Sequence, residues 1–193
     1  MKLDHLNDET IKEILMIQDR LKVMDAKSES RDSFLGYIKH VWPEFIEGEH
    51  HRLFAQKLED VAKGKIKRLI VNMPPRHTKS EFASVYFPSW FMGLKPNTKI
   101  MQTTHTAELS VRFGRKVRNL MDQNEYKQLF DDFGLSADSK SAGRWETNKG
   151  GEYFAAGVGG AITGRGADLL IIDDPHSEQD AMSPAALESA WEW

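Results

Sequence analysis

Apolar residues in the first third of the chain recur at the three- and four-residue spacing of amphipathic helices. This spacing predicts an N-terminal helix within residues 1–30, a second helix from Asp32 to Trp42, and a third from His50 to Lys63. The charged run 27–31 indicates a polar link between the first two helices. The apolar positions are Ile11, Ile14, Leu15 and Leu21 in the first helix, Phe34, Leu35 and Ile38 in the second, and Leu53, Phe54 and Leu58 in the third.

Four later apolar runs, at 69–72, 98–103, 152–156 and 167–174, have the length of strands. Helical patterns separate the first run from the second and the second from the third, and we expect the helix that follows Ser80 to end or kink at Pro88. Strands that alternate with helices are typical of a parallel sheet covered by helices. The sequence therefore predicts an α/β fold with a central, mainly parallel sheet. We expect an N-terminal helical appendage over 1–31 and one domain over 32–193.

The segment from Met73 to Ser80, Met-Pro-Pro-Arg-His-Thr-Lys-Ser, lies between the first predicted strand and a helix. P-loop enzymes have the pattern G-x-x-x-x-G-K-S/T here, in which backbone N–H groups surround phosphates, the lysine reaches the terminal phosphates and the hydroxyl holds Mg²⁺. The segment keeps the Lys-Ser pair and has neither glycine, so the match to the pattern is degenerate. The predicted phosphate-binding residues are Pro75, Arg76, His77, Thr78, Lys79 and Ser80.

The apolar run 167–174 ends in two carboxylates, Asp173 and Asp174. Such a run is expected of a parallel strand that is buried on both faces. P-loop enzymes need an aspartate at this place to hold Mg²⁺, often with an adjacent acid that orients the attacking water. We therefore expect the phosphate loop and the acidic strand end to meet at the carboxyl edge of the sheet.

Composition narrows the class of protein without identifying its chemistry. The chain has 193 residues, of which 40% are hydrophobic and 28% charged, as in ordinary soluble globular proteins. The net charge of −3 means that a nucleic-acid partner would have to bind to local basic patches. The absence of cysteine excludes disulfides and thiolate metal sites, and no apolar run is long enough to span a bilayer. A cytoplasmic protein with no membrane partner is the default expectation.

Two further sets of residues each have two interpretations. Arg165 lies in the glycine-rich loop 157–166, where it either forms a structural ion pair with a local carboxylate such as Asp168 or binds phosphate. His50 and His51 are adjacent, so on a helix they point about 100° apart and cannot both face one metal. We expect a surface or capping role for both histidines, with a place in a nucleotide's base pocket as the alternative.

Over about residues 33–193 the chain resembles the N-terminal ATPase domain of the large terminase subunit of tailed bacteriophages. The most specific segment is AITGRGADLLIIDDPH, in which a glycine-rich loop, an arginine, an acidic strand and a proline follow in the family's order. The other matching segments are VWPEF ahead of GEHH, GKIKRLIVNMPPRHTKS, and RWETNKGGEYFAAGVGG.

This resemblance implies an ASCE-type P-loop ATPase that uses ATP and Mg²⁺ to pump double-stranded DNA into an empty capsid. The implied partners are double-stranded DNA, the portal protein, the small terminase subunit and further copies of the chain. The copies would form a ring on the procapsid, with a pentamer expected there and a monomer in isolation. The implied location is the host cytoplasm. The chain would end before the family's coupling motif and nuclease domain, so we expect no nuclease activity from it.

The resemblance also implies roles for individual residues. Lys79 matches the phosphate lysine, while Ser80 and Asp173 match the Mg²⁺ ligands. Asp174 takes the place of the family's catalytic glutamate. Because aspartate is one methylene shorter than glutamate, Glu178 is an alternative base.

Two arginines and one threonine complete the comparison with that family. Arg165 is similar in position to the arginine that related terminases insert into a neighbour's site, and Arg76 is a second arginine that the family tends to carry. Thr78 stands where the family has a glycine, and a β-branched residue resists the positive φ that glycine allows. This difference predicts weak nucleotide binding or a shifted loop.

Two other functions fit the same motifs. A helicase-like P-loop ATPase would share both the phosphate loop and the acidic strand. A degenerate docking module that does not hydrolyse ATP would explain Thr78 and the missing glycines.

Overall fold

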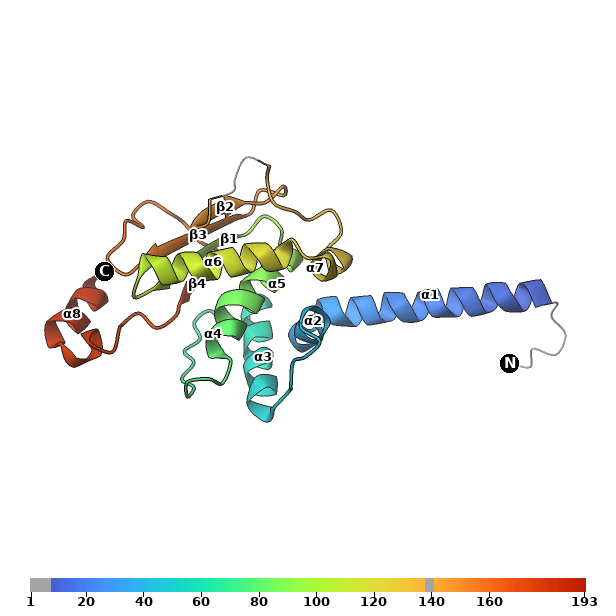
Figure 1. Ribbon diagram of the computed structural model, residues 1–193, viewed down its shortest axis with the longest axis horizontal. Helices are drawn as coiled ribbons and strands as arrows, with labels where there is room; N and C mark the ends of the chain where they lie inside the picture. The colour runs from blue at the N-terminus through green and yellow to red at the C-terminus, as the bar shows by residue number, and fades with distance from the viewer. Residues whose placement is uncertain (1–7, 138–140) are drawn as a thin grey trace.

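The computed structural model describes residues 8–137 and 141–193, which form a mixed α/β structure (Figure 1). Its sheet contains β1 (Lys99–Thr104), β2 (Arg144–Glu146), β3 (Glu152–Gly157) and β4 (Leu169–Ile172), in the order β2-β3-β1-β4. β1 pairs in parallel with both β3 and β4, whereas the short β2 is antiparallel to β3. The predicted α/β class with a mainly parallel sheet is therefore confirmed.

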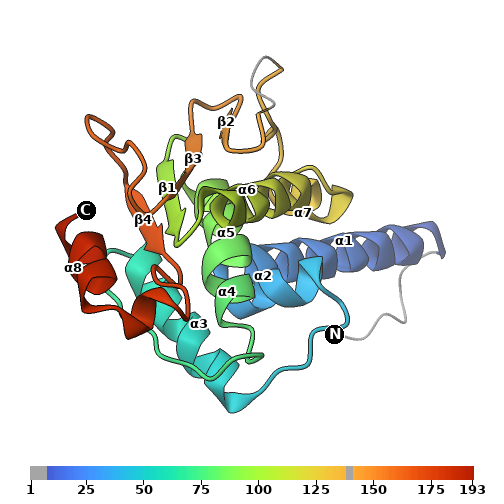
Figure 2. The same ribbon diagram turned by 60° about the vertical axis from the view of Figure 1, so that its left-hand side comes forward.

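Helices surround this sheet, and α6 packs against β1 and β3 (Figures 1 and 2). Thr106 caps α6, because its side chain accepts a hydrogen bond from Leu109 N at 3.2 Å. The helices are α1 (Asp8–Asp32), α2 (Phe34–Val41), α3 (Glu49–Ala62), α4 (Lys79–Glu81), α5 (Phe87–Leu94), α6 (Ala107–Met121), α7 (Asn124–Leu129) and α8 (Pro184–Glu192), with a π-helical turn at Phe82–Tyr86 and a 3₁₀ turn at Asp180–Met182.

The predicted polar link at 27–31 is wrong, because α1 continues through these residues to Asp32. Neither glycine nor proline interrupts this charged run, so the backbone hydrogen bonds of the helix persist. The break comes at Ser33, whose hydroxyl caps α2 by accepting from Gly36 N. The expected appendage thus is one helix, and its first residues, 1–7, lie outside the described part of the chain.

Helix α1 extends away from the body of the protein and contacts it near its C-terminal end (Figures 1 and 2). There Trp90 Nε1 donates to Arg31 O at 2.8 Å and Lys27 pairs with Asp131 at 2.9 Å. Among the described residues, no helix is both long enough and apolar enough to cross a membrane. Side chains of α1 that stay more than half exposed are Leu15, Met16, Ile17, Leu21 and Met24.

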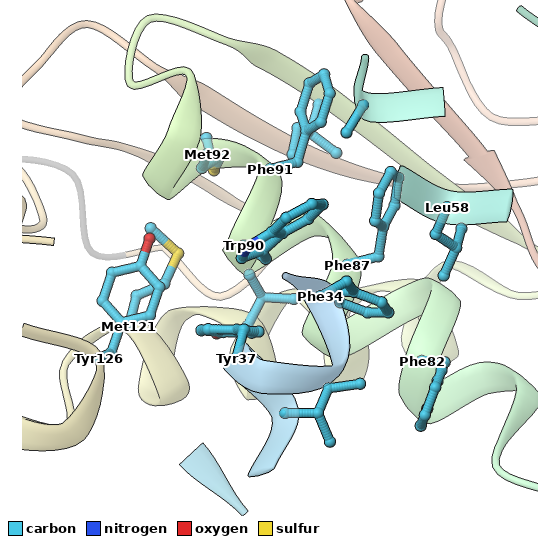
Figure 3. Packing of buried hydrophobic residues seen from close by; sticks show 14 of the residues in the cluster. Phe34, Tyr37, Leu58, Phe82, Phe87, Trp90, Phe91, Met92, Met121 and Tyr126 are labelled. Atoms are coloured by element: carbon cyan, nitrogen blue, oxygen red, sulfur yellow. The ribbon is translucent and has the colours of Figure 1, made fainter. Parts of the chain in front are cut away.

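The core is rich in aromatic side chains contributed by α2, α3 and α5 (Figure 3). The ring of Phe34 lies 5.7 Å from Phe82, 5.8 Å from Phe87 and 5.2 Å from Trp90, measured between centroids. Phe82 also stacks on Phe54 of α3 at 5.7 Å. Since Phe82 follows Ser80 by two residues, this packing anchors the helical end of the predicted phosphate loop.

The predicted strand at 69–72 is wrong, because these residues belong to no strand and pair with none. Leu69 and Val71 pack against the core, while Ile70 between them is 88% exposed. The side chains thus alternate as in a strand, and the apolar pattern records this alternation. Pairing needs an adjacent strand, which no local pattern can specify.

Strand β4 is confirmed as a parallel strand, but the expectation that both of its faces are buried is wrong. Ile171 is 8% exposed, whereas Leu170 and Ile172 are 52% and 55% exposed. Within residues 8–137 and 141–193, β4 pairs only with β1 and forms an edge of the sheet. A continuous apolar run therefore does not distinguish a central strand from this edge strand.

The helix after Ser80 does not end at Pro88. Helical structure continues from Lys79 to Leu94, with Pro88 in the first turn of α5. The π-helical turn Phe82–Tyr86 lies immediately before it, and a proline is tolerated where the preceding turn leaves its missing N–H unneeded.

Candidate functional site

Lys79 meets both carboxylates of the acidic strand end, as the sequence predicts. Its Nζ lies 3.4 Å from Asp173 Oδ1 and 2.5 Å from Asp174 Oδ1, although the two partners are more than 90 residues away in the chain. The side chain of Asp173 is 6% exposed and that of Asp174 is 60% exposed. One lysine therefore bridges a buried and an exposed carboxylate.

The carboxyl edge of the sheet fixes the two aspartates through their backbone. Asp173 N donates to Thr103 O at 2.9 Å, which continues the pairing of β4 with β1. His105 N donates to Asp174 O at 3.1 Å, and Asp174 has a left-handed φ of 46°. This turn directs the second carboxylate out of the line of the strand and toward Lys79.

A buried polar pair holds Asp173 from behind, and sequence reasoning missed it. Ser84 Oγ donates to Asp173 Oδ2 at 2.8 Å, and Gln102 Nε2 donates to Ser84 Oγ at 3.1 Å. Both Ser84 and Gln102 are fully buried. Ser84 follows Ser80 by four residues, so helical spacing could have pointed to it. Gln102 lies on β1, and only the sheet register brings it here.

The phosphate-loop segment borders an open depression of about 520 Å³. This volume is within the range of small-molecule sites. His77 and Glu178 do not line this depression. The Nδ1 atom of His77 forms a hydrogen bond with Pro75 O at 2.9 Å, and Glu178 is exposed on the loop after β4. The lining residues are Met73, Pro74, Pro75, Arg76, Thr78, Lys79, Ser80, Glu81 and Asp174.

The loop has the backbone conformation that the missing glycine would favour. Thr78 has φ 62° and ψ 14°, and Arg76 has φ 64°. Left-handed φ values are uncommon outside glycine and are most costly for β-branched residues. The fold therefore holds Thr78 in a conformation that a β-branched side chain resists.

His51 contacts the phosphate loop through a hydrogen bond that the sequence did not predict. It is 6% exposed, so the expected surface role is wrong, while the capping role is confirmed because Gly48 N donates to its Nδ1 at 2.9 Å. Its Nε2 lies 2.7 Å from Thr78 Oγ1. Burial lowers the pKa of His51, the neighbouring His50 and His77 lower it further, and Glu47 opposes them.

The electrostatics of Lys79 favour its charged form. Burial alone would lower its pKa, but hydrogen bonds and charge from Asp174 and Asp173 outweigh burial and raise the pKa above its usual value. A permanent cation beside the depression is suited to an anionic ligand.

Ser80 lines the depression, and the buried Asp173 lies next to Lys79 without lining it. Their oxygens are of the kind that a nucleotide's Mg²⁺ ion prefers. Carboxylate and hydroxyl oxygens, here from Asp173 and Ser80, are Mg²⁺ ligands, and this ion is usually held by one or two carboxylates plus phosphates. Across 8–137 and 141–193, no group of three or more His, Cys, Asp or Glu side chains could hold a metal ion by itself. The donor set therefore suits a shared ion better than a resident one.

Arg165 lies near the amino ends of the parallel strands, whereas Lys79 lies at their carboxyl ends. Its guanidinium is 3.5 Å from Glu152 Oε1 and 4.0 Å from the ring centroid of Phe154. Glu152 begins β3, whereas the aspartates follow the end of the parallel β4. The expected ion pair is present with Glu152 in place of Asp168, whose Oδ2 accepts from Lys99 N at 2.8 Å.

Comparisons with known proteins leave this geometry to be interpreted by itself. No protein-family model, no curated protein and no solved structure matches the chain.

Proposed function

We propose that this chain binds Mg²⁺–ATP at the depression beside Lys79 and hydrolyses it. One observation carries the proposal: Lys79 Nζ lies within 3.4 Å of Asp173 and 2.5 Å of Asp174, at the carboxyl edge of a mainly parallel sheet. Ligands of α/β proteins bind at this edge. A P-loop ATPase needs a lysine, a hydroxyl and an acidic strand end in the same place.

Each residue of the proposed site has a task that its chemistry allows. Lys79 would exchange its carboxylate partners for the terminal phosphates, and the N–H groups at the start of the helical segment 79–94 would bind phosphate oxygens. Ser80 and Asp173 would hold Mg²⁺, which when bound neutralises charge on the phosphates. Asp174 is exposed at the depression, where it would orient the attacking water; Glu178 remains the alternative base.

We further propose that ATP hydrolysis drives the packaging of double-stranded DNA, on the strength of the terminase-like segments of the sequence. The portal protein, the small terminase subunit and a ring of identical chains on the procapsid would be the partners, in the host cytoplasm. Arg165 pairs with Glu152 at the start of β3, whereas Lys79 of the same chain lies at the carboxyl ends of the strands, so we assign Arg165 a role at a neighbour's site. Arg76 lines the depression and would act on phosphate within the same chain.

Calorimetry with Mg²⁺–ATP on the wild type and on Lys79→Ala tests the proposal. Charge-assisted hydrogen bonds contribute about 1.5–3 kcal/mol, so the variant should bind roughly 10- to 150-fold more weakly. Lys149→Ala is the matched control, since Lys149 is exposed in the turn between β2 and β3 and does not line the depression. Equal affinity of wild type and Lys79→Ala would refute the phosphate role of Lys79.

A second candidate is a nucleotide-binding module that does not hydrolyse ATP. The ion pair of Lys79 with Asp174 favours it, because both groups that an ATPase must free are neutralised by each other in the ligand-free fold. Tight Mg²⁺–ATP binding without phosphate release, in a chain assembled into a ring, would identify this second function.

A further inference from the structure

A chain of three hydrogen bonds connects helix α3 to the phosphate loop. Gly48 N is 2.9 Å from His51 Nδ1, His51 Nε2 is 2.7 Å from Thr78 Oγ1, and Thr78 Oγ1 is 2.6 Å from His77 O. A backbone N–H can only donate and a carbonyl can only accept. These two ends therefore require that Nδ1 accepts, that the Thr78 hydroxyl donates to the carbonyl, and that the proton of the ring is on Nε2.

The middle of this chain is the residue with the most costly backbone conformation in the loop. Thr78 is β-branched and has φ 62°, and it directly precedes Lys79. Such conformations persist only where the surrounding structure enforces them. The hydroxyl of Thr78 is held on both sides, by His51 Nε2 and by His77 O.

His51 is itself fixed by packing. Its ring contacts Phe45 at 4.8 Å edge-on and Phe82 at 5.1 Å in a stacked arrangement, measured between centroids. Phe82 belongs to the helical segment that follows the loop. The ring of His51 is therefore held between Phe45 and this segment. A group that is buried and oriented in this way can define the position of its hydrogen-bond partner.

We propose that His51 is a positioning residue that holds Thr78 in its left-handed conformation and thereby fixes the shape of the phosphate loop. The hydrogen bond from His51 lets Thr78 keep the positive φ that a glycine would adopt without a partner. The consequence for nucleotide binding rests on the proposed function; the effect on the loop does not.

A double-mutant cycle of His51→Phe and Thr78→Gly tests this inference. Phenylalanine keeps an aromatic ring between Phe45 and Phe82 but removes both ring nitrogens. Coupled neighbours typically show an interaction of about 2- to 150-fold in an equilibrium constant. We expect His51→Phe to lower the folded-to-unfolded ratio by about tenfold more with Thr78 present than in the Thr78→Gly background, on the same scale. A loss of equal size in both backgrounds would mean that His51 only packs, and would overturn the proposal.

His40→Phe is the matched control for the cycle. His40 Nε2 also makes a hydrogen bond, to Glu125 O at 3.0 Å, but far from the loop. Its effect should be the same in both Thr78 backgrounds. Coupling of His40 to Thr78 as strong as that of His51 would contradict the inference.

Nitrogen NMR of the wild type measures which ring nitrogen of His51 carries the proton, and it needs no substitution. The expected result is a protonated Nε2 and an unprotonated Nδ1 for His51 at neutral pH. A proton on Nδ1 would overturn the hydrogen-bond chain.

Mg²⁺–ATP binding to the same four proteins separates this inference from the proposed function. We expect about fivefold or more weaker binding for His51→Phe with Thr78 present, and little change in the Thr78→Gly background. If the wild type does not bind, the proposed function fails while the stability cycle still decides the role of His51. If the wild type binds and the cycle shows no coupling, only the role of His51 fails.

Discussion

Replacement of Ser84 should destabilise the protein through the carboxylate of Asp173. Ser84 Oγ donates to Asp173 Oδ2 at 2.8 Å and accepts from Gln102 Nε2 at 3.1 Å, and all three side chains are buried. Ser84→Ala leaves the carboxylate oxygen and the amide without this partner. The Oε1 atom of Gln102 already has no hydrogen-bond partner. The replacement also removes the partner of Nε2, so it adds a second unpaired polar atom to this buried amide.

The expected magnitude follows from the charge of the acceptor. A lost hydrogen bond to a charged group costs about 1.5–3 kcal/mol, and an unsatisfied neutral donor adds about 1 kcal/mol or more. We therefore expect Ser84→Ala to lower the free energy of unfolding by about 2–4 kcal/mol. In a chain of this size this corresponds to a fall in Tm of roughly 4–16 °C.

Urea denaturation followed by circular dichroism measures this loss, with Ser89→Ala as the matched control. Ser89 is equally buried and makes two hydrogen bonds, to Tyr86 O at 2.8 Å and to Tyr37 OH at 2.7 Å, but neither partner is charged. Ser84→Ala should cost about 1–2 kcal/mol more than Ser89→Ala, because only the former removes a charge-assisted bond. Equal losses would refute the argument that Ser84 supports the carboxylate of Asp173.

Two further predictions concern His51 and Arg165. Because burial lowers the pKa of His51 in the folded state, its contribution to stability should be complete above the unfolded value of about 6.5 and should decline as pH falls through it; denaturation of wild type and His51→Phe at several pH values measures the difference, and parallel curves would contradict it. In an assembled ring, Arg165→Ala should slow ATP hydrolysis by about 10³-fold or more if this arginine acts on a neighbour's phosphate. Mixing with Lys79→Ala chains should restore part of the rate. Arg144→Ala, which removes another partner of Glu152, is the control, and the absence of rescue would count against Arg165.

Local sequence patterns determined the helices, the parallel strands and the identity of the main site residues. Helical spacing is local, so α2 and α3 lie close to the residues where the sequence predicts them. The Lys-Ser pair before a helix and the two aspartates after an apolar run similarly identify Lys79 and Asp173. These features depend on neighbours within a few residues, and for that reason they can be predicted from a single sequence.

Tertiary structure alone decided which distant groups meet. The apolar run at 69–72 stays unpaired and β4 has exposed side chains, because pairing depends on which strands are adjacent. Arg165 was expected to bind phosphate or to pair with a local carboxylate such as Asp168, and the carboxylate that it meets in the structure is Glu152, at the start of β3. The partners of Thr78 and Asp173, namely His51 and Ser84, come from helix packing that no spacing rule includes.

Thr78 illustrates the division between local and tertiary control most directly. By itself, a β-branched side chain disfavours positive φ, and from the sequence the loop should be strained or displaced. The fold places His51 where its ring nitrogen meets the hydroxyl of Thr78, at 2.7 Å. The sequence by itself thus determined the chemistry available at the loop, and the tertiary structure determined its conformation, because hydrogen bonds between distant elements outweighed a local backbone preference.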